Sequence, residues 1–564
     1  MKKVITTISF YCLLILISCQ SRQRTVTLAA INLINLKQGE VVLCGPVDKQ
    51  LGSVGFEISC SENVKKDFNL GLALLHSFEY EEAEKVFAKI IYADPGCAMA
   101  YWGVAMCNYH QLWPSPPTPS ELEKGLRAIT LAQGITYTSP KESAFIDAMA
   151  VFYKNWEHKD HHTRNLLFEK EMEKVHLSFP DDIEAAVFYA LALDGSADPA
   201  DKSYINQRKA GDILNALYPT HPDHPGIVHY LIHTYDNPEL ANLALPAARK
   251  YASIAPSSAH AQHMPSHIYT RLGYWDESIA SNLNSIASAR CYAENAGIKG
   301  HWDEELHGMD YLVYAYLQKG DNKRAQDQND SLQGMLEVFP SNFKVAYSFA
   351  AIPARYVLEN KMWLEAANLN SYPPHFNWEM FPWQNAILHF ARALGNAHLG
   401  RLDSAKVEIN QLRKMRDSLI AAKDSYKANQ VWIQMEISES WWLFNSGKQN
   451  EGLSRMKQAT EMEEKTEKSP VTPGEVLPAR ELLGEMLILM NQYPEALAAF
   501  EADLKNHPNR FNGLFGAGLA AEKSKQNKKA ITYYNQLINI ADANSTRPEL
   551  VHARMFLDKS KKQI

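Results

Sequence analysis

The sequence predicts an all-α fold, a superhelical solenoid of antiparallel helix pairs with a short extended or β N-terminal segment. The first observation behind this prediction is a 34-residue period near the C-terminus. Glycine, alanine and aromatic positions recur at that period, as Gly484, Ala496 and Phe500 and then Gly518, Ala530 and Tyr534. The second observation is a proline, Pro508, that closes the first of these units. A fixed period of this length is typical of stacked helical repeats.

The same pattern opens the main body of the chain, in "FNLGLALLHSFEYEEAEKVFAKIIYADP" from Phe68. Gly71 occupies the small position of the first helix, Ala83 and Phe87 occupy the second helix, and Pro95 ends the unit. The period and residue types resemble the tetratricopeptide repeat (TPR). Wider stretches such as "HMPSHIYTRLG" resemble a group of bacterial TPR lipoproteins. The resemblance implies first helices that line a concave surface, where a protein, peptide or small ligand binds.

We therefore divide the chain by the repeat pattern. The segments "GEVVLCG" and "LGSVGFEISC" do not fit it and indicate short strands or extended backbone. The expected parts are a lipoprotein signal peptide (1–18), a linker with the short extended segment (19–61), N-terminal repeats with a His-rich groove (62–290), degenerate middle repeats (291–468), C-terminal repeats (469–545), and a terminal helix or tail (546–564).

The N-terminus predicts export. Lys2 and Lys3 precede an apolar stretch that is too short to span a bilayer, which is typical of a signal peptide. The sequence Leu16-Ile17-Ser18-Cys19 resembles the bacterial lipobox, which implies lipid attached to Cys19. We expect an outer-membrane location that faces the periplasm, with membrane contact through the lipid anchor only. The alternative is a plain secretory signal with a chance cysteine.

Charge and cysteine content narrow the function classes. The formal net charge is −7 and no long basic stripe occurs, so we expect no nucleic-acid partner. After Cys19 the sequence contains five cysteines, an odd number, so at least one thiol is free unless it pairs between chains. Export allows a disulfide, and Cys44–Cys60 is one option.

Histidines gather in one part of the repeats, since residues 221–267 contain seven of the 20 in the chain. His229 and His233 form an i, i+4 pair, and 34 residues later His263 and His267 form another. Each pair shares one helix face. The repeat register turns that face away from the packed side of the helix, so we expect both pairs to face the concave groove from neighbouring helices.

These side chains predict a metal site. We expect His307 and Asp310 on the groove side of the next first helix, beside the two pairs. Further candidates for the groove are His76, His110, His224 and His260. Neutral imidazoles suit zinc, copper, iron or nickel, so a transition metal ion is the expected cofactor. The alternative is a polar groove that hydrogen-bonds an organic ligand or peptide.

Three functions follow, from different classes. The first is an exported binding protein with a ligand, protein or metal ion in its His-lined groove. The second is a metal-dependent enzyme that uses the His229/His233/His263/His267 cluster, with an unknown reaction and unknown catalytic residues. The third is a structural assembly factor. A zinc protease is disfavoured, because "HYLIH" and "HMPSH" lack the glutamate that follows the first histidine of such a helix. We expect a binding protein more than an enzyme.

Overall fold

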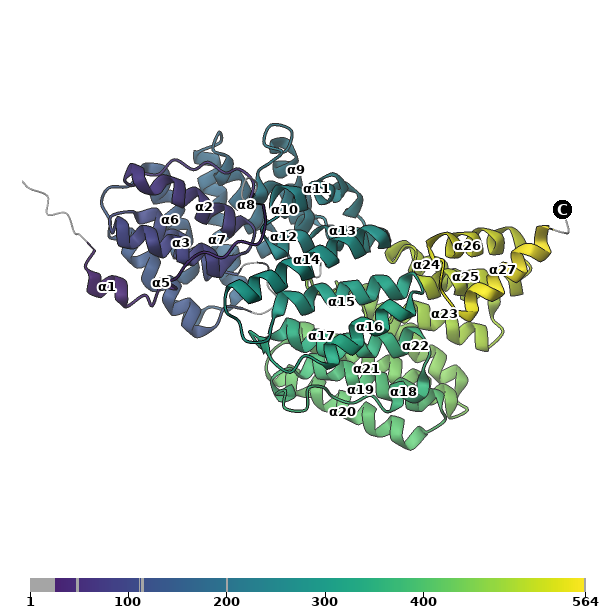
Figure 1. The fold of residues 1–564 in the computed structure, drawn as a ribbon. Coiled ribbons are helices and arrows are strands. Elements are labelled where there is room, and N and C mark those ends of the chain that lie inside the picture. Colours follow the sequence, from purple (N-terminus) through teal and green to yellow (C-terminus); the bar gives the residue numbers. More distant parts are fainter. Residues whose placement is uncertain (1–25, 47–49, 111, 113–115, 199–200, 562–564) are drawn as a thin grey trace, which may run out of the picture.

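The computed structural model describes residues 26–46, 50–110, 112, 116–198 and 201–561, and these form antiparallel helix pairs stacked along the chain (Figure 1). Within them the all-α, TPR-like solenoid prediction is confirmed. The signal peptide and Cys19 lie outside the described residues. None of the helices in the described part combines the length and apolar character that a membrane span requires.

The N-terminal part runs to the end of a long helix at Asn295. Its helices are α1 (Leu28–Asn32), η1 (Glu62–Val64), α2 (Lys65–His76), α3 (Tyr80–Ala93), α4 (Ala98–Cys107), α5 (Pro119–Gln133), α6 (Pro140–Tyr153), η2 (Trp156–His158), α7 (His161–Ser178), α8 (Ile183–Ser196), α9 (Ile205–Leu217), α10 (Pro225–Thr234), α11 (Ala241–Ile254), α12 (Ala259–His263), α13 (Pro265–Leu272) and α14 (Trp275–Asn295).

The rest of the chain continues the row and includes one short pair of strands. Its elements are β1 (His301–Trp302), α15 (Asp303–Gln318), α16 (Asn322–Gln333), β2 (Val338–Phe339), α17 (Phe343–Glu359), α18 (Trp363–Ala367), η3 (Trp378–Met380), α19 (Pro382–His398), α20 (Leu402–Ala421), α21 (Ser425–Asn445), α22 (Gln449–Glu464), α23 (Ala479–Leu489), α24 (Tyr493–Asn506), α25 (Phe511–Lys523), α26 (Asn527–Ile540) and α27 (Pro548–Lys561).

Small residues let the two helices of a pair approach closely. A Cβ atom added to Gly484 of α23 would lie 2.7 Å from the Phe500 ring of α24. The equivalent position in the next pair is Gly518, where a Cβ would lie 2.4 Å from the Tyr534 ring. The 34-residue period therefore reflects a steric requirement. The aromatic ring of the second helix packs against the glycine backbone of the first, where a side chain would not fit.

Helix ends follow local sequence signals. Thr118 and Ser139 form capping boxes with Glu121 and Glu142 at the starts of α5 and α6. Pro265 has no N–H to donate, and it divides the stretch 259–272 into α12 and α13. This break separates His263 from His267.

The expected extended segment near the N-terminus lies along the helices without forming a strand. Side-chain carboxylates accept its backbone N–H groups, as Glu82 does from Val42 (2.9 Å) and Glu142 from Ser59 (2.7 Å). Among the described residues, strand pairing occurs only in the middle repeats, where His301 of β1 is in parallel register with Val338 of β2.

Two disulfides fasten the extended segment. Cys44 pairs with Cys291 of α14, and Cys60 pairs with Cys97 at the start of α4. The Cys44–Cys60 option is therefore wrong. The segment runs past two different parts of the solenoid, and each of its cysteines bonds to the cysteine of the helix that it lies against. Cys107 is free and buried.

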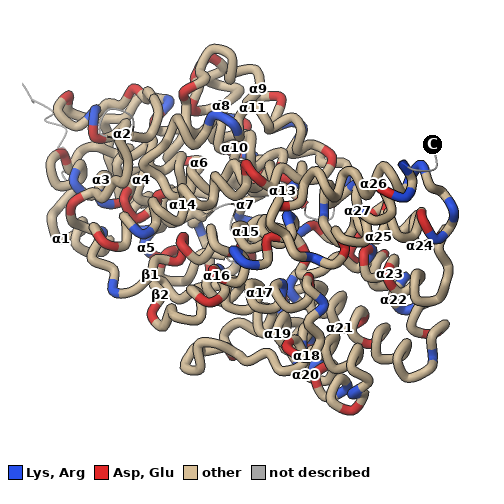
Figure 2. The backbone as a smooth tube through the Cα atoms, turned by 45° about the vertical axis from the view of Figure 1, so that its right-hand side comes forward, with Lys and Arg blue, Asp and Glu red and all other residues tan. Residues whose placement is uncertain are grey.

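Acidic and basic residues alternate over the surface. Figure 2 shows Lys/Arg and Asp/Glu positions interspersed along most helices of the described chain. This distribution agrees with the absence of a long basic stripe from the sequence.

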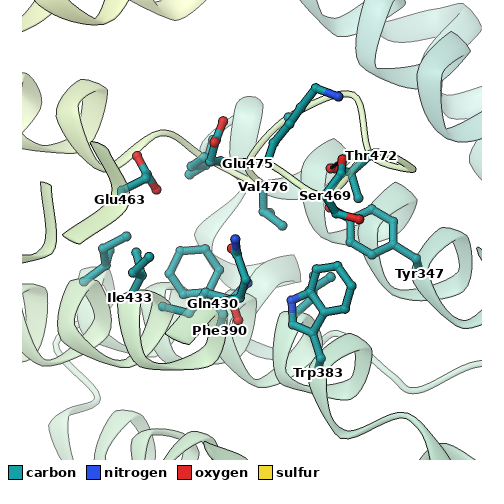
Figure 3. Close-up of a pocket in the computed structure, with 16 residues that line it drawn as sticks. Tyr347, Trp383, Phe390, Gln430, Ile433, Glu463, Ser469, Thr472, Glu475 and Val476 are labelled. Carbon is teal, nitrogen blue, oxygen red and sulfur yellow. Dashed lines mark hydrogen bonds between the residues drawn. The ribbon is translucent and has the colours of Figure 1, made fainter. Parts of the chain in front are cut away.

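A stretch between α22 and α23, residues 465–478, crosses to the N-terminal half, and we call it the crossing segment. Figure 3 shows Ser469, Thr472 and Glu475 of this segment above Tyr347 and Trp383. Its Thr472 carbonyl accepts a hydrogen bond from the Tyr311 hydroxyl at 2.9 Å. The crossing segment therefore covers the inner ends of α15 and α17.

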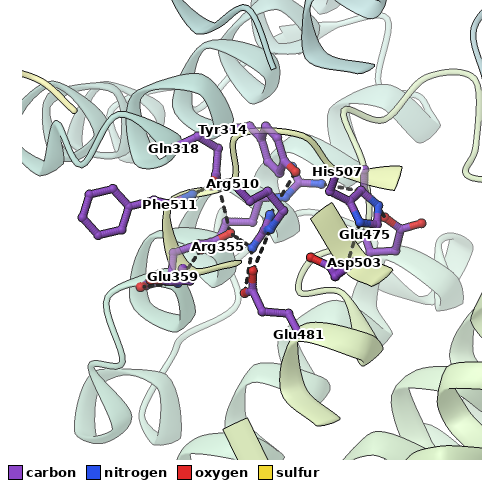
Figure 4. A network of polar contacts seen from close by, with 12 residues as sticks. Tyr314, Gln318, Arg355, Glu359, Glu475, Glu481, Asp503, His507, Arg510 and Phe511 are labelled. Carbon is purple, nitrogen blue, oxygen red and sulfur yellow. Dashed lines mark hydrogen bonds and ion pairs between the residues drawn. The ribbon is translucent and has the colours of Figure 1, made fainter. Parts of the chain in front are cut away.

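A buried ionic network joins the middle and C-terminal repeats beside this segment (Figure 4). Arg510 is fully buried, and its guanidinium lies 2.7 Å from Glu359 and 3.0 Å from Glu481. It also donates to the Tyr314 hydroxyl at 2.9 Å. Arg355 donates to the Gly474 carbonyl of the crossing segment at 2.9 Å. These contacts fix α15, α17, α23 and the crossing segment relative to one another.

We expect Arg510→Met to lower the free energy of unfolding by about 3–5 kcal/mol, because it leaves two buried carboxylates without their cation. Urea titration followed by circular dichroism measures this change. The control is Arg127→Met, at an exposed pair with Glu123, which should cost less than about 1 kcal/mol. Equal losses for the two variants would contradict the role of the network.

Candidate metal centre

Six histidines, five of them buried and His233 partly exposed, meet where three successive inner helices lie side by side. The pair His229 and His233 comes from α10, and the remaining four come from the next two inner positions of the row. These are His260 and His263 on α12, His267 on α13 and His307 on α15. Helix α12 contacts α15, and α10 contacts α13, so the six side chains share one region.

The first group, which we call the first triad, is His229, His233 and His260. The Nε2 atom of His229 lies 3.1 Å from Nε2 of His260 and 3.1 Å from Nε2 of His233. One ring nitrogen from each of the three lies within 4.8 Å of the others. Two nitrogens bound to one ion at 2.0–2.1 Å are about 2.9–3.4 Å apart, so these spacings match those of two ligands on one metal.

The second triad is His263, His267 and His307. The Nε2 atoms of His263 and His267 are 3.1 Å apart. The His307 ring centroid lies 4.2 Å from that of His263, and the three ligand nitrogens again lie within 4.8 Å of one another. The two triads adjoin, since the ring centroids of His233 and His267 are 6.3 Å apart.

Second contacts orient the rings. The Nδ1 atom of His229 lies 2.6 Å from the backbone carbonyl of His76. The Nδ1 atom of His263 lies 2.7 Å from Oδ1 of Asn282, whose Nδ2 donates to the Ser278 carbonyl. His267 places Nδ1 2.9 Å from Oδ2 of Asp236. In each case the acceptor receives a hydrogen bond from the Nδ1–H of the ring. The lone pair is then on Nε2 and faces the triad, as in metal-ligating histidines.

The second triad therefore contains an electrostatic conflict. With Nδ1 of His263 and His267 both donating, the two Nε2 lone pairs face each other at 3.1 Å with no proton between them. A proton would relieve the repulsion, but burial lowers the pKa of His263 to about 4 and that of His267 to about 3. At neutral pH a cation or a hydrogen-bond donor placed between the two Nε2 atoms would satisfy both lone pairs.

The same desolvation acts across both triads. Burial, joined by the neighbouring rings, holds the pKa of His229, His260 and His307 well below the ordinary value. Burial also lowers the pKa of His233 to about 4. All six imidazoles are thus neutral at pH 7, which is the form that binds transition metals.

An aromatic ring covers the first triad. Phe78 follows α2 with a φ of 57°, and its ring centroid lies 4.4 Å from that of His229 and 5.5 Å from that of His260. The ring shields the triad from water and keeps the local dielectric low.

Other predicted site residues lie elsewhere. Asp310 does not join the histidines, because it forms a buried ion pair with Arg355 of α17. His110 follows α4, and its Nδ1 atom lies 4.0 Å from the carboxylate of Glu121 on α5. His76 and His224 flank the buried Glu184 at 2.8 and 3.0 Å and form a hydrogen-bonded group of their own. That group positions the His76 carbonyl that orients His229.

The expected open groove is absent at five of the six histidines, which are buried, with His263 fully inaccessible and His267 2% exposed, whereas His233 is partly exposed and lines a cavity. The physical reason is the crossing segment. Its Lys468 lies 2.9 Å from Asp236, and its Thr472 meets Tyr311, whose ring centroid is 4.7 Å from that of His263. His260, expected only as a further candidate, lies inside the first triad. The orienting residues Asp236 and Asn282 were not predicted, and Asp236 had a sequence signal, three residues after His233.

Comparisons with known proteins agree with the helix pairing. Family models described as tetratricopeptide repeat match residues 68–97 and 489–546. The chain contains tetratricopeptide repeats. This fold is suited to binding proteins and peptides along its helices. No curated protein matches the chain.

Three solved structures show low similarity to the chain. The human IFIT1 dimer with PPP-AAAA shows 11% identity and a TM-score of 0.36, covering 78% of this chain and 90% of that one. The P58(IPK) TPR domain shows 16% identity and a TM-score of 0.20, covering 68% and 99%. The APC/C hetero-tetramer Cut9-Hcn1 shows 14% identity and a TM-score of 0.25, covering 89% and 96%.

The buried histidines predict a pH dependence of stability for metal-free protein. Their folded pKa values are lower than the ordinary value near 6.5, so the unfolded chain binds more protons below that pH. The free energy of unfolding should be highest above about pH 6.5 and should fall as the pH drops toward about 4. Urea midpoints at several pH values measure this slope.

The variant His263→Gln/His267→Gln/His307→Gln should flatten that slope, because glutamine does not titrate. Its matched control is His158→Gln/His375→Gln, at positions outside the triads. A slope that the triad variant leaves unchanged would contradict the assignment of the low-pKa groups.

Proposed function

We propose that this protein is an exported, lipid-anchored TPR solenoid that holds a pair of transition metal ions, one in each histidine triad. The observation that carries the proposal concerns His263 and His267. Their Nε2 atoms face each other at 3.1 Å, while the Nδ1–H of each ring donates a hydrogen bond, to Asn282 and Asp236 respectively. Neutral rings in this arrangement repel one another without a cation. In each triad one ring nitrogen from every histidine converges within 4.8 Å, which supports a metal ligand set.

Copper in the +1 state is the ion we propose. Neither triad includes a carboxylate, and five of the six rings are buried, so each added charge lacks an anionic ligand to balance it. A monovalent ion carries the smallest such cost. Imidazole is also a ligand that suits copper, whereas iron sites with open positions use a carboxylate.

Export fits the covalent structure. The disulfides Cys44–Cys291 and Cys60–Cys97 require an oxidising compartment. The lipobox sequence that ends at Cys19 supplies the anchor. The proposed location is the outer membrane, facing the periplasm.

Metal content tests the proposal. Purified metal-free protein is incubated with copper and ascorbate, passed over a desalting column and analysed by mass spectrometry for copper per chain. We expect one copper per triad, because the triads use separate ligands. His229→Ala/His260→Ala and His263→Ala/His307→Ala should each halve the copper content, and helical circular dichroism should remain near that of the wild type.

The control variant His158→Ala/His375→Ala removes histidines outside the triads and should keep the full copper content. Folded wild-type protein that retains no copper, zinc, iron or nickel at neutral pH would overturn the proposal. If the protein retained zinc in preference to copper in a competition, copper would be the wrong ion, but the assignment of the triads as metal sites would stand.

The anchor has its own test. Cys19→Ala should release the protein from the membrane fraction and remove the label from cells fed a radioactive fatty acid, because the thiol that carries the lipid is gone. Membrane fractionation and autoradiography measure both effects. A variant that stays acylated and membrane-bound would show that the lipobox assignment is wrong.

A further inference from the structure

A cavity of about 380 Å³ reaches the first triad from the side, and we call it the side chamber. Its wall includes His233, and no other member of the two triads lines it among the described residues. The wall is built from α7, the end of α8, α10, the start of α21 and the crossing segment, with lining side chains that include Asn165, Asp194, Tyr204, His233, Tyr426 and Lys468.

The charged groups of the wall are already paired. Asp236 lies 2.9 Å from Lys468 and 2.8 Å from Arg271. Glu467 pairs with Lys202 and accepts from the Tyr204 hydroxyl at 2.7 Å. A charged ligand would therefore find no unpaired counter-ion among these groups, and its desolvation would go uncompensated.

Two polar atoms of the wall have no partner. Asn165 is 3% exposed; its Nδ2 donates to the Gly195 carbonyl at 2.9 Å, and its Oδ1 has no hydrogen bond. Asp194, beside Gly195, receives a hydrogen bond from Thr234 on Oδ2 at 2.5 Å, while its Oδ1 has none. Buried polar atoms without partners are rare in native proteins and point to a missing ligand or water.

The two atoms have complementary roles. Burial raises the pKa of Asp194 to about 8, so its carboxyl is protonated at pH 7, and the Thr234 contact leaves the proton on Oδ1. Oδ1 of Asp194 then donates a hydrogen bond, and Oδ1 of Asn165 accepts one. A hydroxyl group, which accepts and donates at one atom, satisfies both.

We propose that the side chamber binds a small uncharged molecule with a hydroxyl group, its oxygen between Asp194 and Asn165 and its apolar body against Tyr204 and Tyr426, beside His233. The apolar part of the wall, with Leu112 and Pro470, suits a body the size of a six-membered ring. The chamber itself is independent of metal, and only the closeness of this molecule to a bound ion rests on the proposed function.

Calorimetric titration of metal-free protein tests the chamber, with phenol, cyclohexanol, anisole and benzoate as probes. Phenol and cyclohexanol should bind. Anisole, which cannot donate to Asn165, and the benzoate anion should bind at least about fivefold more weakly, since one lost hydrogen bond is worth about that factor. Anisole or benzoate that binds as tightly as phenol would overturn the proposal.

Variants distinguish a specific effect on binding in the side chamber from a general loss of protein stability. Asn165→Ala and Asp194→Ala should each weaken phenol binding about fivefold to tenfold. The control is Asn396→Ala, at a buried asparagine of α19 outside the chamber, which should leave phenol binding unchanged. Unchanged binding in both chamber variants would overturn the proposal even if the copper content is as expected.

Relaxation of bound phenol tests the position of the chamber. With Cu(II) loaded, the ring protons of phenol should relax faster than with Zn(II) loaded, because the paramagnetic ion lies near His233. Equal relaxation with both ions, in protein whose retained copper gives the electron paramagnetic resonance signal of Cu(II), would overturn the placement beside the triad. Protein that binds phenol but no metal would support the chamber and reject the proposed function, so the two failures are distinguishable.

Discussion

Asp236 is the constraint on which the arrangement of the centre depends. Its carboxylate accepts from Nδ1 of His267, and it also holds Arg271 of α13 and Lys468 of the crossing segment. Burial alone would raise its pKa, but the two cations hold the pKa of Asp236 well below its usual range. One side chain thus fixes the tautomer of a triad histidine and fastens the segment that excludes water from it.

The position of the histidine pairs could be predicted because a repeat transmits its register along the sequence. His229 and His263 lie 34 residues apart, and the structure brings both to one region of successive inner helices. The burial of that region could not be predicted in this way. It depends on Lys468 and Thr472, which are more than two hundred and more than one hundred and fifty residues from their partners Asp236 and Tyr311. No local periodicity encodes such contacts.

Asp310 shows the same limit for a single residue. Register placed it one turn from His307 on α15, and the helix does put it there. Its partner is decided by the next inner helix, where Arg355 is fully buried and needs an anion. A buried guanidinium without a carboxylate would cost several kcal/mol, so Asp310 pairs with Arg355 and leaves the second triad with neutral imidazoles alone. The all-nitrogen character of the triads follows from that pairing.

Helix α12 relates the two triads geometrically. It contributes His260 to the first triad and His263 to the second. Residues three apart share a helix face and differ by about 4.5 Å along the axis, at 1.5 Å per residue. His260 and His263 therefore place the two triads about one helical turn apart. Pro265 then breaks the helix and lets His267 approach His263 from a separate segment. The spacing of the two triads therefore depends on the short helix α12. The repeat architecture places the other helices that supply histidines on either side of it.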